Sequence, residues 1–508
     1  MGEVRAEPAP QDHVAQLFGR DSLYMLMWAV QIVSAALLTP ITTRVLGLSS
    51  FGTVTSANAV MQVLFVFAGL GLQTAVQREY SARANPRGAR QLVLAAVVVI
   101  TAISALAWCT TGVWGSFLRM ADHLPALRLA VLWAGASALT TVSLALLRSQ
   151  DKLAFFSVVG LVQSVVAEAL ALGLVKFYRP TAEVFLTGQV TAEFLAALLG
   201  LALAPPALFR LGDRAVLIRA LAFALPLVPS ALSSFVLSTS DRLVIGAALG
   251  SEEVARYQVA YNLGSMPMLL LWILHSAWMP RFFAITGDAE RRTVLAESRD
   301  ALYRLLIPVL IGFAVGAPLV LRIWAPASYR PESLLLPLCV VLITAIPSAG
   351  QLAATRALTA DGRTVVIAVV TMLAAALNVA LNLVLVPWLK LTGSALATLA
   401  AYAFLHVVLS MAGRGTRKAR PPTRLLQLQL AGAAMFAVLS AGLADTPVVL
   451  TVRAVATAGC VAWFLRELTR IGRASATTDG RPLADRPVAG DRSVPGDVER
   501  RVVAPGDQ

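Results

Sequence analysis

Charged residues are scarce in this sequence. Only 14% of the 508 residues are charged, whereas 57% are hydrophobic. A soluble domain of this size needs a charged exterior, so the composition excludes a soluble globular protein. Apolar runs of about 20 residues, enough to cross a hydrocarbon core about 30 Å thick, follow one another along the chain. The sequence therefore predicts an all-α polytopic membrane protein.

Cysteine is also scarce, and it lacks the spacing that metal or redox chemistry requires. Cys109, Cys339 and Cys460 lie far apart inside apolar runs, which predicts neither a disulfide framework nor a metal site. No glycine-rich segment ends in Gly-Lys-Ser/Thr, so the sequence lacks the phosphate-binding loop of an ATP-driven motor. We expect no cofactor, no metal and no catalytic residue.

Acidic residues are outnumbered by basic ones. The chain has 28 Asp and Glu against 42 Lys and Arg, and its net charge is +14. Alternate loops hold about 20 of the basic residues and the intervening loops about eight, as expected for cytoplasmic and outer loops. Arg356 and Arg363 are counted in one such cytoplasmic loop. The basic excess therefore predicts a multi-pass protein of the plasma (inner) membrane with both termini cytoplasmic, and no nucleic-acid partner.

About fourteen transmembrane helices account for this alternation. They are expected at 22–44, 54–76, 91–113, 124–147, 153–177, 183–204, 220–249, 257–279, 301–324, 334–357, 364–388, 392–412, 425–443 and 448–465. A cytoplasmic leader precedes them at 1–21. The tail at 467–508 is rich in Gly, Pro, Asp and Arg, and we expect it to be disordered and cytoplasmic.

An internal repeat divides the spans into two halves. Gly47 aligns with Gly250 at a shift of 203 residues, and the same shift places Arg78 on Arg281. A shift of 210 residues gives a second match, which pairs Asp151 with Asp361 and Glu168 with Asn378. Six helices per half give both halves the same orientation, an arrangement common among transporters. We therefore expect six-helix lobes at 22–210 and 211–413, followed by two extra helices at 414–466.

The seventh span contains an acid and a base, Asp241 and Arg242. Ionisable groups at such depth are costly and mark a functional site by default. Adjacent helix positions point about 100° apart, so the two side chains do not have to pair with each other. Asp241 is a candidate for holding a coupling cation or proton, and a structural pairing is the alternative. Pro226 and Pro229 predict a bend in the inner half of this span.

Three blocks of sequence carry a resemblance to a known family. They are TPITTRVLGLSSFGTV with GLGLQTAVQREYSA, then ALPLVPSALSSFVLSTSDRLVIGAALGSEEVARYQVAYNL, then RALTADGRTVVIAVVTMLAAALNVALNLVLVPWLKLTGSALATLAAYAFL. Over roughly 20–415 the chain resembles the oligosaccharide and polysaccharide flippases of the multidrug/oligosaccharidyl-lipid/polysaccharide exporter superfamily. The resemblance implies two lobes in a V around a cavity lined by spans one, two, seven and eight.

The same resemblance implies a substrate and partners. The substrate would be a polyprenyl-pyrophosphate-linked glycan, moved across the membrane for polysaccharide biosynthesis. Membrane lipids, a polysaccharide polymerase and glycosyltransferases would be its partners.

A pyrophosphate site calls for guanidinium groups, because these fork onto phosphate oxygens and stay charged. The candidate cavity arginines are Arg44, Arg78, Arg242 and Arg281. Positive-inside anchoring is the competing explanation for Arg78 and Arg281, and a buried pair is the competing explanation for Arg242. Polar side chains on the same spans are candidate sugar contacts: Asn58, Gln62, Gln73, Gln258 and Asn262.

Other ionisable groups lie deep in the spans. Glu168 and Glu193 occupy spans five and six, which the resemblance places away from the cavity, so an interhelical role is favoured over a proton site. His275 and His406 are lone histidines on apolar helices, and these more often bond between helices than bind ligands.

Flippase activity by alternating access is the function that the sequence favours. A multidrug or cation antiporter of the same superfamily is the alternative, and it would call for acidic cavity groups. A membrane glycan polymerase or ligase needs a sizeable outer loop for its catalytic side chains, and every outer loop here is short. We therefore expect that the protein is not an enzyme. A silent membrane scaffold would leave the repeat unexplained.

Overall fold

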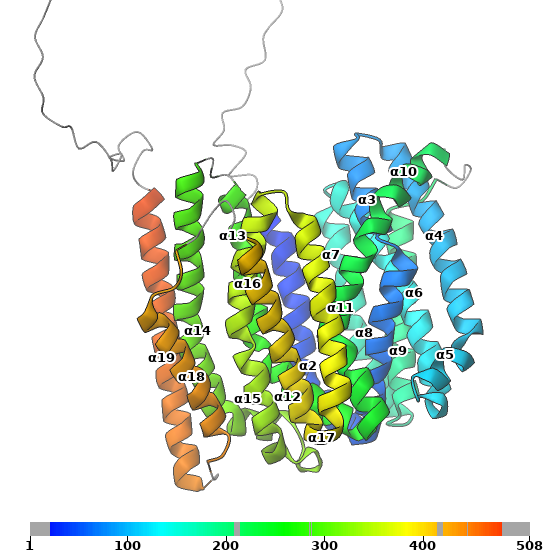
Figure 1. The fold of residues 1–508 in the computed structure, drawn as a ribbon. Coiled ribbons are helices and arrows are strands. Elements are labelled where there is room, and N and C mark those ends of the chain that lie inside the picture. Colours follow the sequence, from blue (N-terminus) through cyan, green and yellow to red (C-terminus); the bar gives the residue numbers. More distant parts are fainter. Residues whose placement is uncertain are drawn as a thin grey trace, which may run out of the picture.

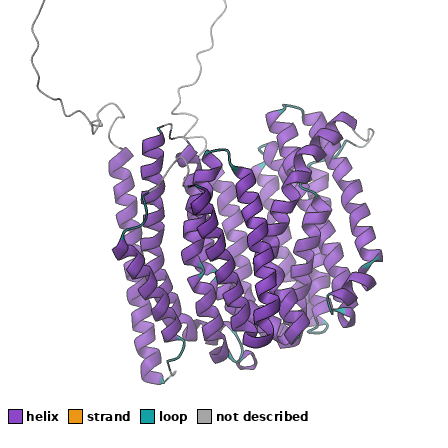
Figure 2. Ribbon diagram, in the orientation of Figure 1, coloured by secondary structure: helices purple, strands orange, loops and turns teal. Residues whose placement is uncertain are grey.

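The computed structural model describes residues 21–207, 214–283, 285, 287–413, 420–443 and 446–479. Over these residues the chain is helical and contains no strand (Figure 2). Ten helices are long and apolar enough to cross a membrane. The all-α membrane fold is thus confirmed, while the total of fourteen spans stays a prediction. The expected lobe boundary at 210/211 lies outside the described residues, as do 1–20 of the leader and 480–508 of the tail.

The first half of the chain forms the helices up to residue 203. They are α2 (Asp21–Gly69), α3 (Leu72–Gln77), the π-helical η1 (Arg78–Ala82), α4 (Pro86–Cys109), α5 (Thr111–Phe117), η2 (Ala121–His123), α6 (Leu124–Ser149), α7 (Leu153–Leu161), the π-helical η3 (Val162–Val166), α8 (Ala167–Phe177) and α9 (Ala182–Leu203). Figure 1 shows α4 at one edge of the molecule and α19 at the other, with the long helices roughly parallel.

The second half and the two extra helices follow. They are α10 (Arg214–Ala224), η4 (Leu225–Leu227), α11 (Val228–Leu249), α12 (Ser251–Gly264), α13 (Met266–Phe283), α14 (Asp288–Trp324), η5 (Ala327–Tyr329), η6 (Pro331–Leu334), α15 (Leu335–Ile343), α16 (Ala345–Ala360), α17 (Thr364–Ala412), α18 (Arg424–Ser440) and α19 (Pro447–Asp479). The last helix passes the expected boundary at 466, and an ion pair between Arg470 and Glu467 lies on this extension.

The backbone supports the first repeat match. Gly47 has φ 73 and ψ 175 inside α2, and Gly250, 203 residues later, has φ 93 and ψ 170 between α11 and α12. Residues that carry a Cβ rarely adopt these backbone angles, so glycine is required at both turns. The same unusual turn therefore separates the first two expected spans of each half.

The second match needs a correction of one residue. Asp151, with φ 55, has its structural counterpart in Gly362, with φ 71, rather than in Asp361. The hydrogen bonds agree, because the amide of Lys152 donates to Leu147 at 3.0 Å and that of Arg363 to Leu358 at 2.9 Å. The π-helical η3 then adds one residue to the first half. That insertion restores the shift of 210 residues beyond it, where Glu168 was paired with Asn378.

The two halves share a buried core at the end of the bundle that carries the glycine turns. Phe51 and Val54 of α2 belong to one apolar cluster with Ile245 of α11 and Val254 of α12. The ring of Phe51 lies 6.4 Å from that of Tyr329. At the opposite end lie the turns 78–86, 149–152 and 361–363, and we call this the arginine-rich end (Figure 1). Toward it α10 of the second half packs into the apolar cluster of the first half, whereas α11, α16 and α17 form a cluster of their own.

The expected seventh span is broken, which confirms the bend predicted from its prolines. Helix α10 ends at Ala224, a single 3₁₀ turn contains Pro226, and Pro229 opens α11. Proline removes a backbone donor and disrupts the preceding helical turn. As a result, α10 packs into the core of the first half, whereas α11 packs against α17, α2 and α12.

The assignment of Arg356 to a loop is wrong. The tenth expected span continues as α16 to Ala360, so Arg356 lies within a helix and is 1% exposed. Its Nη1 lies 3.2 Å from the hydroxyl of Ser298, and its guanidinium lies 5.8 Å from the centre of the Trp278 ring. The count of basic residues in loops misassigned Arg356, because this residue lies near the end of an apolar run that continues as a helix to Ala360.

The first testable prediction concerns the close crossing of α2 and α12 at Gly52. A Cβ at Gly52 would overlap the backbone carbonyl of Ser251, so Gly52→Ala should force α2 away from α12. We expect a loss of about 1–3 kcal/mol of stability, the usual cost of overpacking. Thermal unfolding of the detergent-purified protein measures it. Gly173→Ala is the matched control, because a Cβ there meets nothing within 4 Å. Equal unfolding temperatures for Gly52→Ala and wild type would refute the close crossing.

Candidate functional site

A buried ion pair lies in the middle of α11. Asp241 is 1% exposed and Arg242 is 4% exposed, and Nη1 of Arg242 lies 2.6 Å from Oδ1 of Asp241. The same Nη1 donates to the backbone carbonyl of Ser238. The other carboxylate oxygen of Asp241, Oδ2, is buried without a hydrogen-bond partner among the described residues. The adjacent residues therefore pair, because burial makes an unpaired charge more costly than bending two side chains together.

Helix α12 completes the surroundings of Arg242. Its Nε donates to Oε1 of Gln258 at 3.0 Å, and Nε2 of Gln258 donates to Oδ1 of Asn262 at 2.7 Å. The guanidinium lies 4.0 Å from the ring centre of Tyr261 and 5.6 Å from that of Tyr257. Two predicted sugar contacts are thus hydrogen-bonded into one network with Arg242. The tyrosines were missed, although their spacing of four residues places both on one helical face.

A second polar cluster ties α11 to α17. Ser240, next to Asp241, lies 3.3 Å from Oδ1 of Asn378. Asn382 donates to the backbone carbonyl of Asn378 at 2.9 Å and accepts from Ser394 at 2.7 Å. Both asparagines are fully buried. The sequence signal that could have identified these two asparagines is their spacing of four residues inside a long apolar run. No group of three His, Cys, Asp or Glu side chains suited to a metal occurs in the described part of the chain.

Arg78 lies in a hollow at the arginine-rich end. The hollow has a volume of about 540 Å³ and is also lined by Arg148, Ser81, Asp151 and Phe223. Arg78 is exposed and lies on the π-helical turn η1, with its guanidinium 4.1 Å from the centre of the Phe223 ring. Phe223 belongs to α10, so Arg78 contacts the seventh span. Two guanidinium groups thus face one water-accessible space, and the sequence had marked Arg148 only as a loop charge.

Arg44 lies at the opposite end of the molecule. Its Nη2 donates to the carbonyl of Ile323 at 2.5 Å, and the hydroxyl of neighbouring Thr43 donates to the carbonyl of Trp324 at 3.1 Å. Both acceptors belong to the last turn of α14, where helix carbonyls lack partners within the helix. Arg44 therefore fastens the first half to the second. Arg281 lies on α13, and its side chain is outside the described residues. The arginines expected in one cavity are thus not gathered in a single pocket.

The remaining predicted sugar contacts lie on α2 and α3. Asn58 and Gln62 are half-buried and form no hydrogen bond within the described part of the chain. Gln73 lines a small cavity of about 120 Å³ between α2–α3 and η4–α11, opposite Val228 and Phe235. Gln73 therefore lies at the seam between the two halves.

The deep acids of the first half are hydrogen-bonded between helices. Glu168 accepts from Thr42 at 2.9 Å and from Gln189 at 2.7 Å. Glu193 accepts from Gln163 at 2.8 Å. Each carboxylate therefore links neighbouring helices, as the sequence had favoured.

Comparison with known families now places the protein. The model of the family described as "Polysaccharide biosynthesis protein" matches residues 41–333, more than half of the chain. The chain belongs to the polysaccharide biosynthesis protein family. A search of curated proteins found no match.

Solved structures show which fold this polysaccharide biosynthesis protein has. The lipid II flippase MurJ in an inward closed conformation matches with a TM-score of 0.68 and 12% identity, over 89% of this chain and 99% of that chain. An inward-facing MATE family multidrug resistance transporter matches with a TM-score of 0.59 and 13% identity, over 80% and 99%. A Pyrococcus furiosus transporter of the MOP superfamily, described as having a binding pocket of reverse polarity, matches with a TM-score of 0.55 and 15% identity, over 78% and 94%. Such identities establish the fold alone.

The buried pair generates the second prediction. Removal of one partner leaves an uncompensated charge, so Asp241→Leu or Arg242→Met alone should cost about 3–5 kcal/mol. The double variant, with two apolar side chains, should lose far less than the sum of the single variants. Thermal unfolding of the four proteins of this double-mutant cycle measures the coupling. Additive losses would show that the two side chains do not form a pair.

Proposed function

We propose that this polysaccharide biosynthesis protein is a flippase. It moves a polyprenyl-pyrophosphate-linked glycan across the membrane by alternating access, and it is a transporter rather than an enzyme. The observation that carries the proposal is the family match over residues 41–333, on a fold shared with a lipid II flippase. The arginine-lined hollow supports it, because guanidinium groups bind phosphate oxygens in a two-pronged geometry.

The substrate would meet Arg78 and Arg148 first. Their hollow lies at the arginine-rich end, which the positive-inside rule assigns to the cytoplasm. A pyrophosphate carries several negative charges, and two guanidinium groups beside a wet space can replace part of its hydration shell. The glycan would then lie along the seam, where Asn58, Gln62 and Gln73 offer amide groups to sugar hydroxyls.

For the opposite end to open, the hydrogen bonds from Arg44 and Thr43 to the end of α14 must break. In the present structure Arg44 and Thr43 hold the end of α14, and the two halves share a core there. The amphipathic substrate would leave on that side once the halves rock apart and the arginine-rich end closes. The break at Pro226 gives the seventh span a joint for this motion.

Asp241 would couple transport to an ion gradient by competing for Arg242. While the carboxylate holds Nη1 of Arg242 at 2.6 Å, the guanidinium is neutralised and attracts a phosphate only weakly. A proton or cation at the unpartnered Oδ2 would weaken this hold and release positive charge toward the substrate. Binding of the coupling ion and binding of the anion would then favour each other.

Location and partners complete the proposal. The protein is a multi-pass membrane protein, and we place it in the plasma membrane with both termini cytoplasmic because of its loop charges. A polysaccharide polymerase and glycosyltransferases would be its working partners, since they make and consume lipid-linked glycans.

The alternative is a multidrug or cation antiporter, since MATE transporters share the fold. Such a protein would need an acid free to attract a cation. Here Asp241 is neutralised by Arg242, and the hollow beside Arg78 contains two arginines and one aspartate. Efflux of a cationic dye from vesicles, measured beside glycan transport, separates the two functions.

The third prediction tests the hollow. Arg78→Gln should slow transport of a fluorescent polyprenyl-pyrophosphate glycan in proteoliposomes by roughly 10–100-fold, because a bond to a charged group contributes about 1.5–3 kcal/mol. Arg87→Gln is the matched control. It removes the same charge from an exposed residue at the same end that does not line the hollow.

Replacing the candidate arginines tests whether transport depends on an anion-binding path. Arg242→Ala should abolish transport while the protein stays inserted in the membrane. Wild-type transport by a variant with Arg242→Ala, Arg78→Ala and Arg281→Ala together would rule out an anion-binding path.

The fourth prediction concerns coupling at Asp241. An amide mimics the neutralised carboxyl, so Asp241→Asn should lower the KM for the lipid-linked glycan and remove the dependence of transport rate on an imposed proton or sodium gradient. Rates measured with and without each gradient test this. Asp122→Asn, at an exposed acid on the short helix η2, should behave as wild type. Retention of the wild-type gradient dependence by Asp241→Asn would assign coupling to another group.

A further inference from the structure

A second large hollow lies within the second half of the molecule. Its volume is about 550 Å³, inside the range of about 300–1,000 Å³ that is typical of small-molecule sites. It is bounded by the start of α14, the end of α16, the end of α17 and the segment that leads to α18. All of these boundaries lie at the arginine-rich end, and the hollow does not include the residues around Arg78 or Arg242.

The walls of this hollow are apolar because its residues are small or aliphatic. They are formed by Leu295, Ala353, Ala354, Ala357 and Leu409. Alanines on successive turns of α16 leave room that larger side chains would fill. The interior is therefore suited to hydrocarbon rather than to a sugar.

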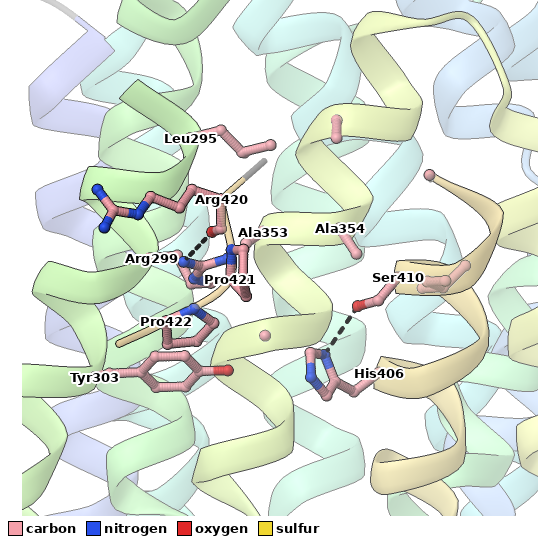
Figure 3. Close-up of a pocket in the computed structure, with 14 residues that line it drawn as sticks. Leu295, Arg299, Tyr303, Ala353, Ala354, His406, Ser410, Arg420, Pro421 and Pro422 are labelled. Atoms are coloured by element: carbon pink, nitrogen blue, oxygen red, sulfur yellow. Dashed lines mark hydrogen bonds between the residues drawn. The ribbon is translucent and has the colours of Figure 1, made fainter. Parts of the chain in front are cut away.

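Polar groups lie at one place in this apolar space. A Cβ at Gly350 would lie 2.6 Å from the hydroxyl of Tyr303 and would overlap the ring of His406, so glycine is needed to bring these two side chains together. Figure 3 shows them extending toward each other across the hollow, with Ser410 3.4 Å from Nδ1 of His406. The hydroxyl of Tyr303 makes no hydrogen bond within the described residues. The hydroxyl of Tyr303 could therefore donate a hydrogen bond to a ligand oxygen that lies between these side chains.

Arginine side chains lie at the mouth of the hollow. Nη2 of Arg299 donates to the backbone carbonyl of Arg420 at 2.7 Å, which holds the segment before α18 across the opening (Figure 3). Arg299 also pairs with Asp300 through Nε and Nη2, which leaves Nη1 without a hydrogen bond in the described part. Among the described residues Asp300 thus pairs with Arg299 alone, and the exposed side chain of Arg420 extends from the same mouth in the other direction (Figure 3).

The sequence of this segment adds to the positive charge. GRGTRKARPPT, residues 413–423, contains four Lys or Arg and no acid. Residues 414–419 lie outside the described part of the chain. Basic clusters directly next to a membrane span attract the anionic lipids of the cytoplasmic leaflet.

We propose that this hollow binds an anionic phospholipid of the cytoplasmic leaflet. The phosphate would lie at the mouth beside Arg299, where Arg420 adds positive charge, and the start of an acyl chain would lie along the alanine wall of α16. The basic mouth and the apolar interior fit a molecule that is charged at one end and hydrocarbon at the other. The site is separate from the transport path and fastens the two extra helices to the second half.

Lipid binding by the purified full chain tests the assignment. Wild type should retain phosphatidylglycerol in native mass spectrometry, and its unfolding temperature should rise with phosphatidylglycerol but not with phosphatidylcholine. Arg299→Gln and Arg420→Gln should each raise the Kd for phosphatidylglycerol about tenfold. Arg420→Gln keeps the backbone carbonyl that Arg299 binds, so it tests charge without removing that contact. Arg424→Gln, an exposed neighbour that does not line the hollow, is the matched control.

Each competing occupant gives a different result. Ala354→Leu should also weaken phosphatidylglycerol binding by filling the wall, and undiminished affinity would place the acyl chain elsewhere. Equal stabilisation by inorganic phosphate would show that the site binds a free anion and no lipid. Displacement of phosphatidylglycerol by polyprenyl phosphate at equal concentration would assign the hollow to the transport path. Wild-type phosphatidylglycerol affinity in both arginine variants would overturn the proposal.

Discussion

The free-energy cost of burying a charge inside a membrane protein explains how the side chains around Arg242 are arranged. Arg242 is nearly fully buried, and its charge is matched by the adjacent Asp241, a carbonyl, an amide and two tyrosine rings. Such a set compensates for lost water only while every member stays in place. The pair therefore holds α11 in a defined position against α12. A change in its charge therefore alters the packing of α11 against α12 within the second half.

The close fit at the end that carries the glycine turns is what makes a rocking motion possible. Gly47 and Gly250 turn the chain at equivalent points of the two halves, and Gly52 allows the backbones to touch. Close contact concentrates the shared apolar core at this end, whereas toward the arginine-rich end α10 joins the core of the first half and α11, α16 and α17 form their own. Two bodies that share a core at one end, and are linked at the other through α10 and the 3₁₀ turn after it, move by rotating about the shared core, because packed cores resist gradual deformation.

The sequence predicted the fold because its signals were local and repeated. Apolar runs, loop charges and the glycine at equivalent turns all report on a few adjacent residues. The site was harder to predict, because its geometry depends on which helices meet. Arg78 was a candidate from the sequence, but its neighbour Phe223 comes from α10 and was not. Gln258 was a candidate sugar contact, and in the structure it accepts a hydrogen bond from Arg242. Arg356 was misplaced because a charge buried by neighbouring helices looks the same in sequence as one in a loop.

The distribution of arginine across the molecule separates three physical tasks. Arg44 binds free carbonyls at a helix end and so acts on the contact between halves. Arg242 is neutralised in the interior by the adjacent Asp241. Arg78 and Arg299 border hollows that open at the arginine-rich end, where phosphate groups of lipids lie. A pyrophosphate-linked substrate and ordinary anionic lipids share the charge of their headgroups, so guanidinium alone cannot distinguish them. Selection then depends on the remaining walls, which are polar and aromatic beside Arg78 and lined with alanine beside Arg299.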